Sequence, residues 1–251
     1  MMAALALSAQ AAGFNKASLK GSYSFLVNTW TAESNTQDAT VGVMTFDGAG
    51  DVTAPYTSVS GGVVQTGTAT GTYTVNSDGT GAINFTAGGY TPQFAIALNS
   101  TAAKVAHGMQ LLRADTTTNL VDSGTALLQS TAAATYSVAS VRGNFSLQLS
   151  TWLADGTLEQ NGIVGIISFD GKGNIKGSYT DMHGGVLSTG TFTGTYTVNS
   201  DGSGSMSLVG AGNSQLAFAL NSVTAGQAKG LQLLSTSEGD NIEVSGVALK
   251  Q

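Results

Sequence analysis

An eleven-residue segment occurs twice in this chain. Residues 71–81 read Gly-Thr-Tyr-Thr-Val-Asn-Ser-Asp-Gly-Thr-Gly, and residues 194–204 repeat them with one change, Ser203 in place of Thr80. In both copies apolar and polar residues alternate, as in a half-buried strand, and then give way to a turn rich in Asn, Asp and Gly. The segment predicts a β-hairpin, and its recurrence predicts a duplicated domain.

The duplication extends over most of the sequence. Trp30 has its counterpart in Trp152, 122 residues later, and Phe46-Asp47-Gly48 recurs as 169–171, 123 residues later. Such small changes of spacing indicate length differences in loops between aligned strands. We therefore predict two domains, residues 14–129 and 136–251, joined by a short linker of small residues, 130–135.

Each copy contains eight runs with the alternation of a strand. In the first copy these runs are 21–29, 41–46, 52–57, 65–75, 81–85, 93–98, 106–113 and 124–129, and a helical turn is expected only within 14–19. Consecutive antiparallel strands leave two sheet edges unless the sheet closes. The prediction is an all-β protein of two tandem eight-stranded up-and-down barrels, with two β-sandwiches as the alternative. Four tyrosines are expected to point inward, where they fill or line the interiors: Tyr56, Tyr73, Tyr179 and Tyr196.

Composition limits the classes of partner. Net charge is −6, and the 9 basic residues form no cluster, which argues against a nucleic-acid partner. Only 10% of residues are charged, against about 25% in a typical soluble domain. The absence of cysteine excludes disulfides, zinc–thiolate sites and a thiol nucleophile.

The first eleven residues resemble the end of a signal peptide. The apolar run of residues 1–7 is followed by Ala9-Gln10-Ala11, which has the small-x-small pattern of a cleavage site. We predict an exported protein, secreted or periplasmic, whose mature chain begins near residue 12. The alternative is an apolar N-terminal strand that stays on the protein. No later run approaches the ~20 apolar residues that a membrane-spanning helix needs.

The order of motifs resembles that of exported, uncharacterised bacterial proteins built from such repeats. The resemblance rests on Gly21-x-Tyr23-x-Phe25, on Phe46-Asp47-Gly48-Ala49-Gly50 and on the repeated segment 71–81, each present twice. More distantly, the layout is similar to lipocalin and allene-oxide-cyclase-like barrels. The lipocalin Gly-x-Trp is replaced here by Gly21-Ser22-Tyr23, and the resemblance assigns no catalytic residue.

Four residues form the predicted binding surface. Histidine is the most frequent general acid or base, but His107 and His183 lie in no nucleophile or metal motif and correspond to Lys229 and Ser60 in the other copy. Trp30 and Trp152 follow the first strand of each copy with parity opposite to that of Tyr23, so we expect them to face outward near a barrel rim. We expect function where the two copies differ, at the histidines and in the loop after Trp152.

The carboxylates are interpreted mainly as structural. Asp47 and Asp170 begin identical turns, which predicts side-chain-to-backbone hydrogen bonds, with Ca²⁺ binding as the alternative. Acids before the last strand of each copy are interpreted as solvated loop charges: Asp115, Asp122, Glu238, Asp240 and Glu243. We predict no cofactor and no metal.

The predicted function is that of an exported, non-catalytic structural, adhesive or surface-binding protein. Its expected partners are a second copy of itself or an extracellular surface or glycan. One alternative is a lipocalin-like carrier of a small apolar ligand, which requires a hollow interior. The other is an isomerase-like enzyme, which requires perturbed acids in a pocket.

Overall fold

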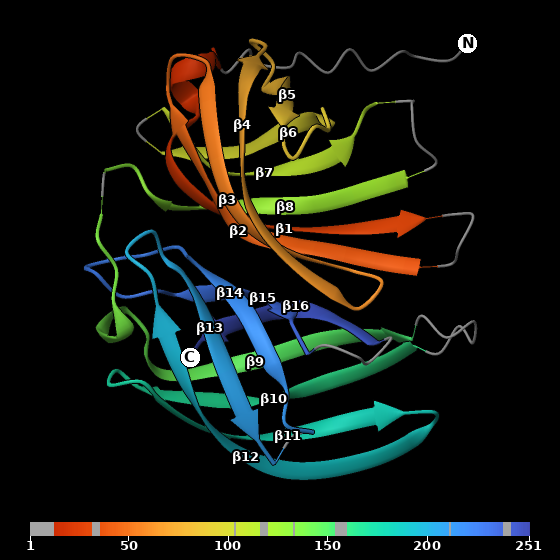
Figure 1. Cartoon of the computed structure of the whole chain (residues 1–251). Coiled ribbons are helices and arrows are strands. Elements are labelled where there is room, and N and C mark those ends of the chain that lie inside the picture. Colours follow the sequence, from red (N-terminus) through yellow and green to blue (C-terminus); the bar gives the residue numbers. More distant parts are fainter. Residues whose placement is uncertain are drawn as a thin grey trace, which may run out of the picture.

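The chain folds into two closed antiparallel barrels of eight strands each, with the strands in up-and-down order (Figure 1). The computed structural model describes residues 13–31, 36–102, 104–115, 120–132, 134–153, 160–210, 212–237 and 242–251. The barrel prediction is confirmed and the sandwich alternative is wrong. The predicted signal segment, residues 1–11, lies outside the described residues.

The strands of the two barrels correspond one to one. The first barrel contains β1 (Lys20–Thr31), β2 (Thr36–Asp47), β3 (Asp51–Ser60), β4 (Val63–Val75), β5 (Thr80–Thr86), β6 (Gln93–Ala102), β7 (Val105–Arg113) and β8 (Leu120–Ser130). The second contains β9 (Arg142–Leu153), β10 (Gln160–Asp170), β11 (Asn174–His183), β12 (Val186–Val198), β13 (Ser203–Val209), β14 (Gln215–Asn221), β15 (Gly230–Ser235) and β16 (Ile242–Lys250). Pairing of β1 with β8, and of β9 with β16, closes the two sheets.

The repeated segment forms the β4–β5 and β12–β13 hairpins. Tyr73 pairs with Ile83, and in the turn the Asp78 carboxylate accepts hydrogen bonds from the Thr80 backbone N–H (3.0 Å) and hydroxyl (2.7 Å). Gly79 adopts φ +90° at this turn, a left-handed conformation that favours glycine. The hairpin predicted from the sequence is confirmed.

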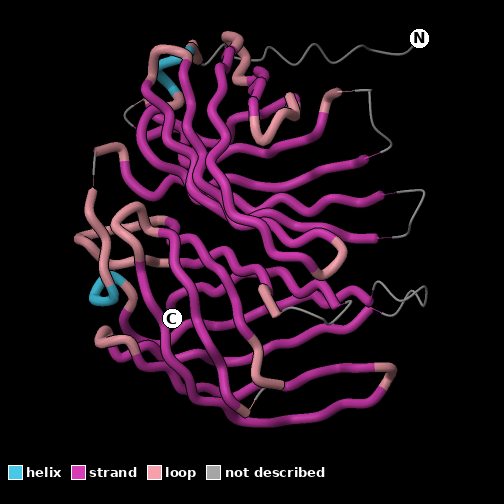
Figure 2. The backbone as a smooth tube through the Cα atoms, viewed as in Figure 1, coloured by secondary structure: helices cyan, strands magenta, loops and turns pink. Residues whose placement is uncertain are grey.

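A short 3₁₀ segment closes one end of each barrel. These segments, η1 (Lys16–Ser18) and η2 (Val138–Ser140), lie at the same end of both barrels (Figure 2). The Tyr73 hydroxyl lies 3.0 Å from the carbonyl oxygens of both Lys16 and Leu19, and donates its hydrogen bond there. Tyr196 makes the equivalent contacts at 2.9 Å with Val138 and Val141. The repeated tyrosine therefore attaches the closing segment to the barrel wall.

Aromatic rings fill the half of each barrel next to this closed end. Phe46 is 5.0 Å from Tyr73 and 5.5 Å from Tyr23, measured between ring centroids, and both contacts are edge-to-face. Phe169 occupies the same position between Phe145 and Tyr196. The inward orientation expected for Tyr73 and Tyr196 is confirmed, because both belong to the buried cores.

We expect the stability of the protein to fall as the pH rises from 10 to about 12. Burial, followed by repulsion from Asp47, raises the pKa of Tyr73 from 10.0 to about 12. The tyrosine therefore ionises first in the unfolded chain, which favours unfolding above pH 10. Urea unfolding across this pH range should show a shallower decline for Tyr73→Phe than for the wild type. An identical decline would contradict this role. Burial also raises the pKa of Tyr23, Tyr136 and Tyr196, so the variant removes only part of the slope.

The two barrels pack against each other through their outer faces. An apolar cluster joins the first barrel to the second, and contains Leu26, Ala39, Val41, Val43 and Val59, with Val64 beside them, on one side and Ala217, Ala219 and Leu234 on the other. Polar contacts flank it, including Ser245 to Asn28 (2.9 Å) and the Gln232 amide to the Thr125 carbonyl (3.2 Å). The barrels thus lie side by side, with β14–β16 against the first barrel (Figure 1).

No helix among the residues that the structure describes has the length and apolar character needed to cross a membrane.

Candidate functional site

The other half of each barrel is hollow. A cavity of about 280 Å³ opens at the end of the first barrel opposite η1, and one of about 250 Å³ lies in the corresponding half of the second. Both are lined mainly by apolar side chains, and one inward tyrosine contributes to each wall, Tyr56 in the first and Tyr179 in the second. The barrels are therefore cups that are filled at one end and open at the other.

An ion-pair cluster lies on the wall of the first cup. Arg113, at the end of β7, contacts Asp122 of β8 through Nη1 at 2.8 Å and Asp115 through Nε at 2.8 Å. The side chains are only 14%, 7% and 9% exposed, respectively. Burial alone would lower the pKa of Arg113, but its attraction and hydrogen bonds to the two carboxylates hold that pKa above its ordinary value. The guanidinium is thus fixed in its charged form.

Asp122 has acceptor capacity that the described residues leave unused. Its Oδ2 binds Arg113, whereas its Oδ1 is buried and has no donor in the part of the chain that the structure describes. A buried carboxylate oxygen without a donor is costly, so such a group marks a place where a ligand can contribute a hydrogen bond. Asp38 also lines the first cavity, so among the described residues two carboxylates and one cation face it.

The second barrel lacks this cluster. Ser235, Ser237 and Val244 stand where the first barrel has Arg113, Asp115 and Asp122. Ser237 replaces Asp115 as the acceptor for the backbone N–H at the start of its neighbouring strand, at 3.0 Å from Gln215 N. The scaffold therefore does not need the charges, and the cluster distinguishes the first cup from the second.

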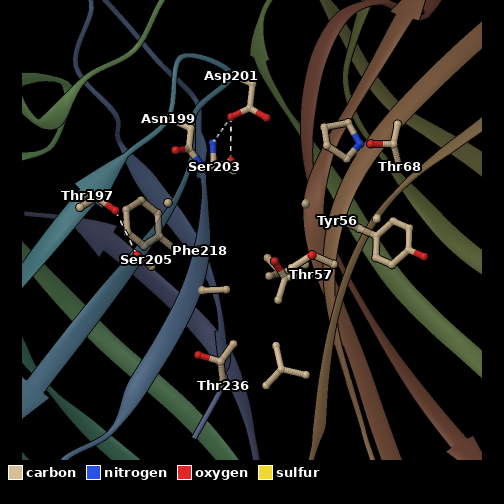
Figure 3. Close-up of a pocket in the computed structure, with 18 residues that line it drawn as sticks. Tyr56, Thr57, Thr68, Thr197, Asn199, Asp201, Ser203, Ser205, Phe218 and Thr236 are labelled. Carbon is tan, nitrogen blue, oxygen red and sulfur yellow. Dashed lines mark hydrogen bonds between the residues drawn. The ribbon is translucent and has the colours of Figure 1, made fainter.

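A larger opening of about 640 Å³ lies between the barrels (Figure 3). We call it the wedge; many of its lining side chains bear a hydroxyl group, and these lie on facing strands of the two barrels in Figure 3. Several of the polar groups satisfy one another, as Asp201 does with Ser203 at 2.7 Å and Thr197 with Ser205 at 3.0 Å. Because these groups already have partners, the wedge offers a ligand less than the Asp122 site does.

His107, His183 and Trp30, three of the four residues predicted to form a binding surface, do not come together. His107 is exposed on β7, and His183 is exposed at the end of β11. Trp30 is half-buried near the end of β1, and the side chain of Trp152 on β9 lies outside the described residues. His107, His183 and Trp30 line none of these three cavities. Their role in binding stays a prediction.

The turn aspartates form the expected hydrogen bonds. Asp47 Oδ1 accepts the backbone N–H groups of Ala49 (2.7 Å), Gly50 (2.8 Å) and Asp51 (3.0 Å), which hold the pKa of Asp47 below its ordinary value. Asn174, through its side chain and then its backbone, lowers the pKa of Asp170 to about 2. Within the described ranges, no group of three or more His, Asp or Glu residues is placed to hold a metal ion.

Interpreting Asp115 and Asp122 as solvated loop charges was wrong. Asp122 lies within β8 and is 5% exposed, and the Asp115 side chain is 9% exposed. The alternation of side chains along β7 could have identified this site. Met109 and Leu111 point inward, and Arg113 is the next residue on the same face of the strand. A charged residue on an inward position indicates a buried ion pair. Glu238 and Asp240 lie outside the described residues, and so does the side chain of Glu243.

Known proteins similar to this chain supply no activity for it. No protein-family model and no curated protein matches the chain. A solved structure from Nostoc punctiforme PCC 73102, described as a protein with unknown function from the DUF3598 family, is similar over 93% of this chain and 97% of its own. The sequence identity is 12% and the TM-score is 0.28.

Proposed function

We propose that the protein is a non-catalytic binding protein whose first barrel holds a small, mostly apolar molecule bearing an amine or another hydrogen-bond donor. The main support for this proposal is Asp122, a buried carboxylate on the wall of a mainly apolar cavity. One of its oxygens has no hydrogen-bond donor among the described residues. The apolar lining favours the body of the ligand, while the oxygen favours its N–H or O–H group.

The charge around the cavity favours a cationic ligand. Among the described residues, Asp38 and Asp122 line it together with the cation Arg113, which Asp115 and Asp122 already neutralise. An ammonium group would therefore be attracted, whereas a carboxylate ligand would meet two like charges. The second cup, without the Arg113 cluster, is proposed to take a less polar ligand. Export, predicted from residues 1–11, would place this binding outside the cytoplasm.

The proposal can be tested with ligands of matched shape. Calorimetry and ¹H–¹⁵N spectra should show cyclohexylmethylamine binding to the first barrel more tightly than cyclohexanecarboxylate. Asp122→Asn should weaken amine binding by about 10- to 100-fold, the range expected when a charged hydrogen bond is lost. Asp181→Asn, at the mouth of the second cavity, is the matched control and should leave amine binding unchanged.

Two results would overturn this function. The first is equal binding of amine and carboxylate, and the second is equal amine affinity for the wild type and Asp122→Asn. The structural or adhesive role predicted from the composition and the absence of catalysis stay predictions.

A further inference from the structure

The contact between the barrels joins different faces of the two copies. The first barrel contributes residues of β1–β4, which we call its front face: Leu26, Ala39, Val41, Val43, Val59 and Val64. The second contributes residues of β14 and β15, which we call its back face: Ala217, Ala219 and Leu234. A contact between unlike faces is heterologous, so it leaves one face of each kind unused.

The unused front face belongs to the second barrel. Val164, Met182 and Leu187 occupy the positions of Val41, Val59 and Val64, and they are 56%, 43% and 62% exposed. Their counterparts are buried or packed against the contact between the barrels. The second barrel thus exposes apolar side chains where the first barrel covers them.

The unused back face belongs to the first barrel. Ala95, Ala97 and Leu112 occupy the positions of Ala217, Ala219 and Leu234. All three are exposed, Leu112 to 53%, whereas Leu234 is fully buried. Gln110, the counterpart of Gln232, is exposed beside them. Figure 1 shows β6 and β7 on the side of the first barrel away from the second barrel, and β11 and β12 on the opposite side of the molecule.

We propose that this protein self-associates head to tail, with the front face of the second barrel of one copy docked on the back face of the first barrel of the next. The second front face and the first back face are both exposed, and most of their residues are of the same type as the residues that form the contact within the chain. Two substitutions reduce the apolar character of the second front face, since Gln148 replaces Leu26 and Gly162 replaces Ala39. The contact between copies is therefore weaker than the one within the chain.

The polar contacts also have counterparts. The internal hydrogen bond from the Gln232 amide to the Thr125 carbonyl would become one from Gln110 to the carbonyl of Val247 in the next copy. The Ser245–Asn28 contact would become one between Ser123 and Ser150. A heterologous contact repeated in this way yields a closed ring or an open filament.

Sedimentation of the full chain tests the proposal. The two barrels of one chain are held at an effective concentration in the millimolar range, so a contact of the same kind between separate copies needs a comparable protein concentration. We therefore expect the sedimenting mass to increase as the protein concentration is raised to about 1 mM. Val164→Asp and Leu112→Asp should each be monomeric across that range. Val209→Asp is the matched control, because Val209 is a 60% exposed valine outside both faces, and it should associate like the wild type.

Mixing the two monomeric variants gives the sharpest result. Leu112→Asp keeps an intact front face and Val164→Asp keeps an intact back face, so the mixture should form a one-to-one dimer that grows no further. A symmetric contact or unspecific aggregation would not produce that dimer. A wild type that stays monomeric throughout, or a mixture that stays monomeric while the wild type associates, would overturn the proposal. Circular dichroism of each variant confirms that it is folded.

Discussion

Replacing Arg113 by methionine is expected to lower the free energy of unfolding of the first barrel by about 3–5 kcal/mol at neutral pH, the usual cost of breaking a buried ion pair from one side. The substitution leaves Asp115 and Asp122 buried together without their cation. Urea unfolding at neutral pH measures this loss.

The second barrel supplies the matched rescue. The triple variant Arg113→Ser, Asp115→Ser, Asp122→Val carries the residues that the second barrel has at these positions, and we expect it to recover most of the lost stability while losing selectivity for amines. Arg142→Met, at an exposed arginine, should change stability by less than about 0.5 kcal/mol. If the triple variant is as unstable as Arg113→Met, the ion pair is not the cause.

Replacing Phe46 by alanine is expected to cost about 3–5 kcal/mol, because the buried ring is removed and the surrounding walls cannot fully collapse. Phe46 is 2% exposed and contacts Tyr23 and Tyr73 edge-on, so two aromatic contacts are lost with the buried area. Phe169→Ala should have a similar effect in the second barrel, since Phe169 is 3% exposed between two rings.

One tryptophan per barrel allows the two effects to be separated. Trp30 belongs to the first barrel and Trp152 to the second, and the chain has no other tryptophan. In a Trp152→Phe background, the fluorescence of Trp30 measures the unfolding of the first barrel that carries Phe46→Ala. In a Trp30→Phe background, the fluorescence of Trp152 shows whether the second barrel unfolds together with the first. Tyr90→Ala, at a side chain that is 78% exposed, is the control. A loss below about 1 kcal/mol for Phe46→Ala would contradict a tightly packed aromatic core.

The local sequence pattern was sufficient to predict the strands and turns, but not to predict the site. The alternation around Tyr73 and the Asp78-Gly79 turn specify a hairpin, because side chains on a strand alternate between faces and glycine accepts positive φ. Arg113 and Asp122 lie on neighbouring strands, and their proximity depends on the register in which β7 pairs with β8. Arg113 and Asp122 also differ between the two copies, but the sequence pointed to His107 and His183, whose side chains are exposed.

The sequence by itself determined the duplication, the eight strands of each copy and the inward direction of Tyr73 and Tyr196, because these follow from periodicity and turn chemistry. The tertiary structure decided three other things. It left half of each interior hollow, it buried Asp122 beside Arg113, and it docked a front face on a back face so that Val164 and Leu112 remain exposed. The physical reason is that cavity volume, ion pairing and docking depend on distances between strands far apart in sequence, which a period of two residues does not encode.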